Sequence, residues 1–215
     1  YRTAGSVYDC YLLNPGFGYG AGFDRYEENQ LGADARARRA TSWLDDSDRP
    51  GFLFVHFYDP HSDTGALPYE AAPEYLERFA PGDPALFEGW ARTVGASEAL
   101  HQVNVGERRM SPEQRAAVPR LYDAGVAETD AALGVFLDRL SEAGRYDDAL
   151  IIVVADHGEA LGESDHFMHE LLIEETLHVP LLVKWPRGRD AGTVRSDLVE
   201  TVDLNPTVLA ALGLP

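Results

Sequence analysis

The sequence predicts an α/β fold with a mostly parallel central sheet. Two apolar runs of strand length, residues 52–58 and 150–154, carry no polar alternation, as is typical of parallel strands covered on both faces. Between these runs, apolar residues recur at helical spacing after Ser111 and Pro112. A strand, a long helix and a second strand in this order indicate the α/β class.

The first fifty residues are expected to form a strand, a loop and a helix. Strand-forming residues occupy positions 1–8, and a glycine-rich loop follows at 14–22. The spacing of these glycines does not match G-x-G-x-x-G, so a dinucleotide site is not supported. Asp34 is expected to cap a helix that ends before Pro50.

The apolar run 52–58 leads into Asp59, Pro60 and His61. A single histidine after a strand is more often structural than functional. Residues 68–90 are rich in Pro, Glu and aromatics and are expected to shape a cleft. Four polar residues further along could line the same cleft, but a solvated helix face is the simpler interpretation: Glu98, His101, Asn104 and Arg108.

The long helix is marked at both ends. Ser111 is expected to be its N-cap, with Pro112 in the first turn and Gln114 completing a capping box, and Gly144 should follow its last turn. Pro119 marks a potential interruption. The return of the chain into the run at 150 is expected to make the right-handed crossover of a parallel sheet.

The run 150–154 ends in Asp156 and His157, two residue types that bind metals, and Gly158 then allows the chain to turn. Ligands of open α/β sheets bind beyond the carboxyl ends of strands, so the functional site is predicted here. The alternative is that Asp156 is only a turn or N-cap residue. Residues 161–169 are expected to form a loop, 181–184 a short strand, and 203–207 the start of a helix.

Composition limits the classes of function. The 215 residues carry a net charge of −18, which argues against nucleic-acid binding because that needs clustered Lys and Arg. The single cysteine, Cys10, excludes a disulfide framework within the chain and is interpreted as a small buried apolar residue. Neither a transmembrane segment nor a targeting signal can be recognised. Because the sequence starts at Tyr1 and stops without a polar tail, we expect a segment of a longer protein.

Several separate stretches resemble the type I sulfatases, a branch of the alkaline phosphatase superfamily. The matching stretches are, in chain order, Gly-Phe-Asp-Arg-Tyr at 22–26, Asp-Pro-His at 59–61, Val-Ala-Asp-His-Gly-Glu at 154–159, Glu-Glu at 174–175 and Asp-Leu-Asn-Pro-Thr at 203–207. The resemblance implies a three-layer α/β/α, alkaline phosphatase-like fold. Residues 1–215 would then form part of a sulfatase catalytic domain, without its N-terminal nucleophile-bearing part and its C-terminal subdomain.

The resemblance also implies roles for particular residues. Asp156 and His157 correspond to a pair of divalent-metal ligands, and His61 to a histidine that contacts the sulfate of the substrate. His169 stands where many sulfatases carry a sulfate-contacting lysine. We therefore expect His61 and His169 to bind the sulfate and protonate the leaving oxygen, with His169 cationic and His157 neutral, which predicts a bell-shaped pH profile.

Other residues near the motif are weaker candidates. His166 is a rival of His169 for the same role. Lys184 is interpreted as an exposed strand end rather than a catalytic group. Asp165, Glu159 and Glu174 are interpreted as carboxylates that could orient a ligating histidine.

The metal is open between two lines of reasoning. Oxygen ligands favour Ca²⁺ and an imidazole favours Zn²⁺ or Mn²⁺, while the resemblance implies Ca²⁺. The family's nucleophile, a formylglycine made in a Cys/Ser-x-Pro-x-Arg motif, is not found in this segment, so the segment alone is expected to be inactive.

The expected substrate is a small-molecule or glycan sulfate ester. Two alternatives remain: a phosphonate monoester or phosphodiester hydrolase of the same superfamily, and a non-catalytic pseudoenzyme that binds sulfated ligands. The resemblance is compatible with a periplasmic or secreted location, although the sequence itself assigns none.

Overall fold

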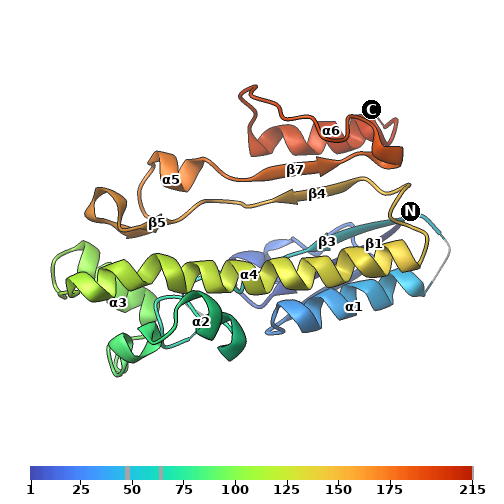
Figure 1. Ribbon diagram of the computed structural model, residues 1–215. Coiled ribbons are helices and arrows are strands. Elements are labelled where there is room, and N and C mark those ends of the chain that lie inside the picture. The colour runs from blue at the N-terminus through green and yellow to red at the C-terminus, as the bar shows by residue number, and fades with distance from the viewer. Residues whose placement is uncertain (47–48, 63–64, 215) are drawn as a thin grey trace.

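The computed structural model describes residues 1–46, 49–62 and 65–214. It is an α/β structure in which strands lie between layers of helices, as predicted. In Figure 1, α1 and α4 run side by side along one side of the molecule, and α6 lies beyond strands β4 and β7 on the other side. The longer elements are β1 (Arg2–Tyr8), β2 (Arg25–Asn29), α1 (Ala33–Asp45), β3 (Gly51–Val55), α2 (Pro73–Phe79), α3 (Ala96–Asn104), α4 (Pro112–Glu142), β4 (Ile151–Val154), β5 (Ala160–Leu161), β6 (Phe167–Met168), α5 (Glu174–Leu177), β7 (Leu181–Lys184) and α6 (Leu204–Ala211).

A parallel sheet of order β2-β1-β3 contains the first three strands. Ala4 of the central strand β1 is opposite Arg25 on one side and Leu53 on the other. Because parallel strands end at the same edge, the segment after β3 starts at the edge where β1 and β2 also finish. His56 joins this edge through its backbone N–H, which donates to the Ser6 carbonyl at 2.9 Å.

The segment 150–154 was predicted to be a buried parallel strand, and this is wrong in two respects. Strand β4 pairs antiparallel with β7, with Ile151 opposite Lys184 and Val154 opposite Leu181. The first three residues of β4 are half-buried, and the last, Val154, is exposed. An apolar run indicates which side chains avoid water but not which strand they pair with. Because β4 pairs antiparallel with β7, α4 does not make the predicted crossover to a parallel neighbour among the described residues.

The predicted strand 52–58 also differs from the structure. Strand β3 ends at Val55, and Phe52 and Phe54 are each 42% exposed. Among the described strands β3 is hydrogen-bonded only to β1, so it lies at an edge of its sheet. The residues from His56 to Tyr58, predicted as strand, instead form the loop that carries His61.

Local chemistry explains the helix ends. In α4 the Ser111 hydroxyl accepts from the Gln114 N–H at 3.2 Å and Gln114 Oε1 accepts from the Ser111 N–H at 2.9 Å, which is the predicted capping box. The helix runs unbroken through Pro119, so no interruption occurs, and Gly144 follows it with φ of 66°. Helix α1 begins at Ala33, and its first N–H is accepted at 2.8 Å by Asp59, not by Asp34.

The main core lies between α3, α4 and β6. It is an apolar cluster that includes Tyr69, Leu100, Leu121 and Phe167. A smaller cluster joins Ala33 and Ala37 of α1 to Ala132 of α4. Helix α4 therefore contacts both the parallel-sheet half and the segment around β6. No helix in the described residues is both long enough and apolar enough to cross a membrane.

Candidate functional site

Three histidines from different parts of the chain lie together. His61 follows β3, His157 follows β4 and His169 follows β6. One ring nitrogen from each lies within 4.8 Å of the corresponding nitrogen of the other two. The ring centroids of His157 and His169 are 3.9 Å apart in a stacked arrangement, and His61 lies 5.3 Å from His169 and 6.2 Å from His157. The structure thus brings together three of the residues selected from the sequence.

His169 is held by a buried carboxylate. Glu159 Oε2 lies 3.1 Å from His169 Nδ1, and its side chain is only 5% exposed. The other oxygen of Glu159 accepts a hydrogen bond from the hydroxyl of Tyr69 at 2.9 Å. The hydrogen bond with Glu159 raises the pKa of His169 above its usual value, although burial acts in the opposite direction. Glu159 was interpreted as a carboxylate that could orient a metal-ligating histidine, and in the structure it contacts His169, which was predicted to bind sulfate.

His157 is oriented by the turn that follows it. Its Nδ1 lies 2.8 Å from the carbonyl oxygen of Gly158. A carbonyl oxygen can only accept, so this contact places a proton on Nδ1. The N–H of Gly158 donates to the Thr176 carbonyl at 2.8 Å, which ties the turn to α5.

Asp156 lies beside His157 at the exposed end of β4. Its Oδ1 is 3.8 Å from His157 Nε2, and its side chain is 83% exposed. Ligand atoms at about 2.3 to 2.6 Å from one ion can be this far apart, so the pair fits two ligands of a shared divalent cation. The remaining oxygen ligands that Ca²⁺ needs would have to come from outside this pair.

An aromatic stack fixes the position of His61. Its ring lies on Tyr58, with centroids 4.3 Å apart and planes at 14°, and Tyr58 stacks on Tyr8 at 4.5 Å. His56 is close by, and burial lowers its pKa, which favours the neutral ring. Tyr8, Tyr58 and Tyr69 were not selected from the sequence, because aromatic residues carry no signal for such long-range contacts.

His166, the rival candidate, is used elsewhere. Its Nε2 lies 3.2 Å from Asn104 Nδ2 and 3.3 Å from Glu170 Oε2. Asn104 also donates to the Phe167 carbonyl at 2.8 Å and accepts from the Phe167 N–H at 2.9 Å. Asn104 was interpreted as part of a solvated helix face, but it fastens α3 to the segment that leads to His169. His101 is fastened in the same way, with its Nδ1 2.7 Å from Glu170 Oε1.

Lys184 lies away from the histidines. It pairs with Ile151, at the opposite end of β4 from Asp156. Its ammonium group donates to the carbonyls of Asp147 at 2.8 Å and Ala149 at 3.0 Å, and also to that of Tyr146. These contacts give Lys184 a structural role in the loop before β4.

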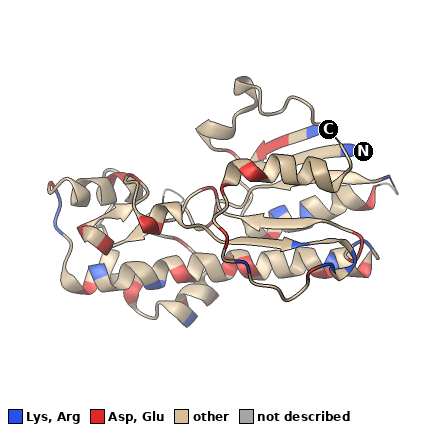
Figure 2. Ribbon diagram, turned by 90° about the horizontal axis from the view of Figure 1, so that it is seen from above, with Lys and Arg blue, Asp and Glu red and all other residues tan. Residues whose placement is uncertain are grey.

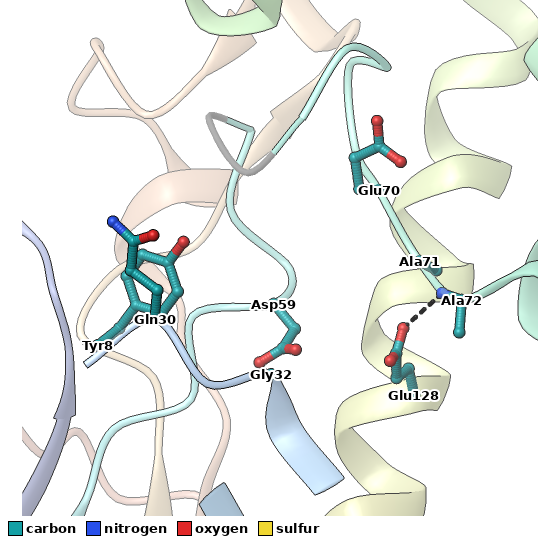
Figure 3. A pocket seen from close by; sticks show the side chains of 8 residues that line it. All are labelled: Tyr8, Gln30, Gly32, Asp59, Glu70, Ala71, Ala72 and Glu128. Atoms are coloured by element: carbon teal, nitrogen blue, oxygen red, sulfur yellow. Dashed lines mark hydrogen bonds between the residues drawn. The ribbon is translucent and has the colours of Figure 1, made fainter. Parts of the chain in front are cut away.

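A hollow of about 230 Å³ is lined in part by Asp59, two residues before His61 in the same loop. Figure 3 shows three carboxylates around it, from Asp59, Glu70 and Glu128, with Tyr8 and Gln30 opposite. Each carboxylate already accepts from a backbone N–H; that of Ala72, for example, reaches Glu128 at 2.7 Å. Burial raises the pKa of Glu128. These carboxylates therefore have a structural role, because each accepts a hydrogen bond that holds a loop or a helix end in place.

Comparison with known proteins gives a consistent family. The family model described as Sulfatase matches residues 21–214. The multifunctional alkaline phosphatase superfamily protein PehA of Trinickia caryophylli is 27% identical over 189 residues, which cover 81% of this chain and 37% of PehA. Human arylsulfatase K is 35% identical over 107 residues, half of this chain and 20% of that protein.

Solved structures show the same fold. The protein BT4656, solved in complex with its substrate D-glucosamine-2-N,6-O-disulfate, superposes with a TM-score of 0.74 at 20% identity. The match covers all of this chain and 59% of BT4656. The phosphonate monoester hydrolase of Agrobacterium radiobacter gives 0.70 at 20% identity, over all of this chain and 56% of that one. The chain thus spans less than two thirds of the relatives that it matches.

Proposed function

Because the chain belongs to the sulfatase family, we propose that it contributes the metal-binding and sulfate-binding half of a sulfuric ester hydrolase. The observation that carries the proposal is the convergence of His61, His157 and His169 beside Asp156. These residues come from three separate segments that match sulfatase motifs. The convergence of segments far apart in the sequence supports a shared role for them at one site.

The proposed roles follow from the contacts of each side chain. Asp156 and His157 would hold a divalent cation, with Ca²⁺ favoured, and this ion would supply positive charge that stabilises an anionic group. His61 and His169 would donate hydrogen bonds to the sulfate oxygens and to the leaving oxygen. Glu159 supports the role of His169, because a buried carboxylate on Nδ1 fixes the ring and leaves Nε2 to meet the substrate.

The nucleophile of the reaction is proposed to lie outside this segment. Cys10 stands in Asp-Cys-Tyr-Leu-Leu, which lacks the Pro and Arg of the formylglycine motif. The segment on its own is therefore proposed to be inactive. A non-catalytic protein that binds sulfated ligands is the remaining case, if the complete protein also lacks the motif.

A phosphonate monoester or phosphodiester hydrolase is the second candidate. Two observations favour it: the similarity to the multifunctional PehA over 81% of this chain and the fold shared with a phosphonate monoester hydrolase. The proposed cation and histidines would accept either tetrahedral anion. The sulfated amino sugar in the related complex is, for the same reason, only a guide to the substrate class.

The test is a parallel assay of the complete protein with p-nitrophenyl sulfate and p-nitrophenyl phenylphosphonate in the presence of Ca²⁺. We expect the sulfate ester to give the higher kcat/KM, and His61→Ala and Asp156→Asn to lower it at least about a hundredfold, the usual range for losing a catalytic proton donor or a metal ligand. His166→Gln is the matched control, because His166 faces Asn104 and Glu170. If His166→Gln abolished turnover while His169→Gln did not, the assignment of His169 would be wrong.

A further inference from the structure

The three clustered histidines have a composition unlike that of a Ca²⁺ site. Calcium selects oxygen ligands, whereas three imidazole nitrogens are the donor set that zinc and its neighbours in the transition series prefer. One ring nitrogen of each of His61, His157 and His169 already lies within 4.8 Å of the chosen nitrogens of the other two. Nitrogens bound to one tetrahedral zinc ion lie about 3.4 Å apart, so shifts of about an ångström in the rings would close the site.

We propose that His61, His157 and His169 together bind a transition-metal ion of the zinc class, in a site that shares His157 with the Asp156–His157 pair but does not use Asp156. The two modes share His157, so a zinc ion held by the three histidines and a calcium ion held by the pair exclude each other at that residue. This site goes beyond the proposed hydrolase activity, since it can be filled and measured without any substrate.

The surroundings of two of the rings are those of metal ligands. A metal-binding histidine commonly donates its second N–H to a carboxylate or a backbone carbonyl, which fixes the tautomer and strengthens the ligand. His169 has such a partner in Glu159, at 3.1 Å, and His157 has one in the Gly158 carbonyl, at 2.8 Å. In both rings these partners favour a proton on Nδ1, so that Nε2 is the donor atom when the neutral ring binds a metal.

The support extends outward from the ligands. Tyr69, which is fully buried, donates to Glu159 at 2.9 Å and holds the carboxylate in place. The stack on Tyr58 restricts the ring of His61. The chain carries a net charge of −18, which favours the approach of cations, and Figure 2 shows acidic residues interspersed with basic ones along the long helix α4. A cluster of three histidines without such partners would need more reorganisation before it could bind.

The imidazole of His169 is what supplies the third ligand of the site. A lysine at this position would keep its positive charge and repel a metal ion, whereas a neutral imidazole can ligate one. The variant His169→Lys therefore removes one ligand and adds a charge in a single step. It is a sharper probe than truncation to alanine.

The experiment is a titration of the complete, metal-free protein with Zn²⁺ by calorimetry, and with Co²⁺ by visible absorption. We expect one ion per chain, and intense d–d bands from Co²⁺ in a site of low coordination number. His61→Gln and His169→Lys should each weaken Zn²⁺ binding at least about tenfold, and Glu159→Gln by about 10- to 100-fold, as expected for loss of a partner of a ligating histidine. Circular dichroism of each variant checks that it folds.

The matched control is His178→Gln. The Nδ1 atom of His178 lies 3.3 Å from Glu174 Oε1 and its side chain is 80% exposed, so its loss should leave the Zn²⁺ affinity unchanged within about twofold. Equal affinity in the wild type and in His61→Gln and His169→Lys would overturn the proposal. So would loss of Zn²⁺ binding with Asp156→Asn alone, because the ion would then occupy the carboxylate–histidine pair. No ester is present in this titration, so a failure to bind Zn²⁺ would leave the hydrolase proposal standing. A protein that binds Zn²⁺ at the three histidines but hydrolyses no ester would refute only the hydrolase proposal.

Discussion

Gly158 sits where the chain can least accept a side chain. A Cβ atom at this position would lie 2.0 Å from the carbonyl oxygen of Glu175 and 3.2 Å from Cα of Thr176. Both obstacles are backbone atoms, so no flexible side chain can move aside. In Gly158→Ala the turn must shift by at least 1.0 Å before the closest contact reaches 3.0 Å, below which Cβ atoms are essentially never found.

Two costs follow from this shift. The 2.8 Å hydrogen bond from the Gly158 N–H to the Thr176 carbonyl is lost, which costs about 0.5 to 1.5 kcal/mol. Overpacking of a closely packed site adds about 1 to 3 kcal/mol. We expect a local destabilisation of about 1.5 to 4.5 kcal/mol, which corresponds to a change of about tenfold or more in an opening equilibrium. His157 and Asp156, immediately before the turn, should be displaced from His61 and His169.

Hydrogen exchange of peptides spanning residues 151–161 measures this effect, because exchange reports local opening. The control is Gly134→Ala in α4, where the new Cβ meets nothing within 4 Å and helix propensity should raise stability by about 0.5 to 1 kcal/mol. If exchange in residues 151–161 were as slow in Gly158→Ala as in Gly134→Ala, the contact between this turn and α5 would not exist as described.

Three further outcomes test the supports of the site and the fold. Tyr69→Phe leaves the buried Glu159 carboxylate short of one hydrogen bond and should lower the free energy of unfolding in urea by about 1.5 to 3 kcal/mol; an unchanged value would contradict the contact. Ser111→Ala should cost about 1 kcal/mol in the same assay and Ser111→Gly only a few tenths, and equal losses would argue against side-chain capping. The hydrogen bond from Arg39 lowers the pKa of Glu27. The stabilisation from this contact is therefore complete above the usual carboxyl pKa and is lost as the pH falls through the lowered pKa of Glu27. Arg39→Met should flatten the fall in the urea midpoint between about pH 6 and pH 3, and a wild-type slope in that variant would refute the pairing.

Features set by neighbours in the sequence could be predicted. The capping box at Ser111 and the positive φ of Gly144 depend on residues within one helical turn, and both occur as expected. The prediction that His61, His157 and His169 lie at one site used more, namely the resemblance of separate stretches of the sequence to sulfatase motifs. The geometry agrees with that expectation, while the chemical roles of the residues stay predictions.

Features set by distant contacts could not be predicted. Strand β4 reads as a buried parallel strand, yet its partner β7 is antiparallel and is about thirty residues away. Asp34 was a reasonable cap for α1 by sequence, but Asp59 accepts the N–H of Ala33 at 2.8 Å instead. Tyr69 and Glu159 are 90 residues apart, and no pattern in the sequence connects them. In each case the deciding atom comes from a part of the chain that periodicity does not link.

Helix α4 lies against both of the loops that carry His61 and His169, and so it influences the distance between these two histidines. At Gly125 it approaches the loop of His61 so closely that an added Cβ would lie 3.4 Å from Cα of Pro60 and 3.2 Å from the Glu70 carbonyl oxygen. One turn earlier, Leu121 packs in the same apolar cluster as Phe167, which precedes His169 by two residues. The loops that carry His61 and His169 therefore rest on adjacent turns of one continuous helix. A continuous helix is stiff over this length, so the separation of the two histidines is set by packing against α4 and not by the strands that precede them.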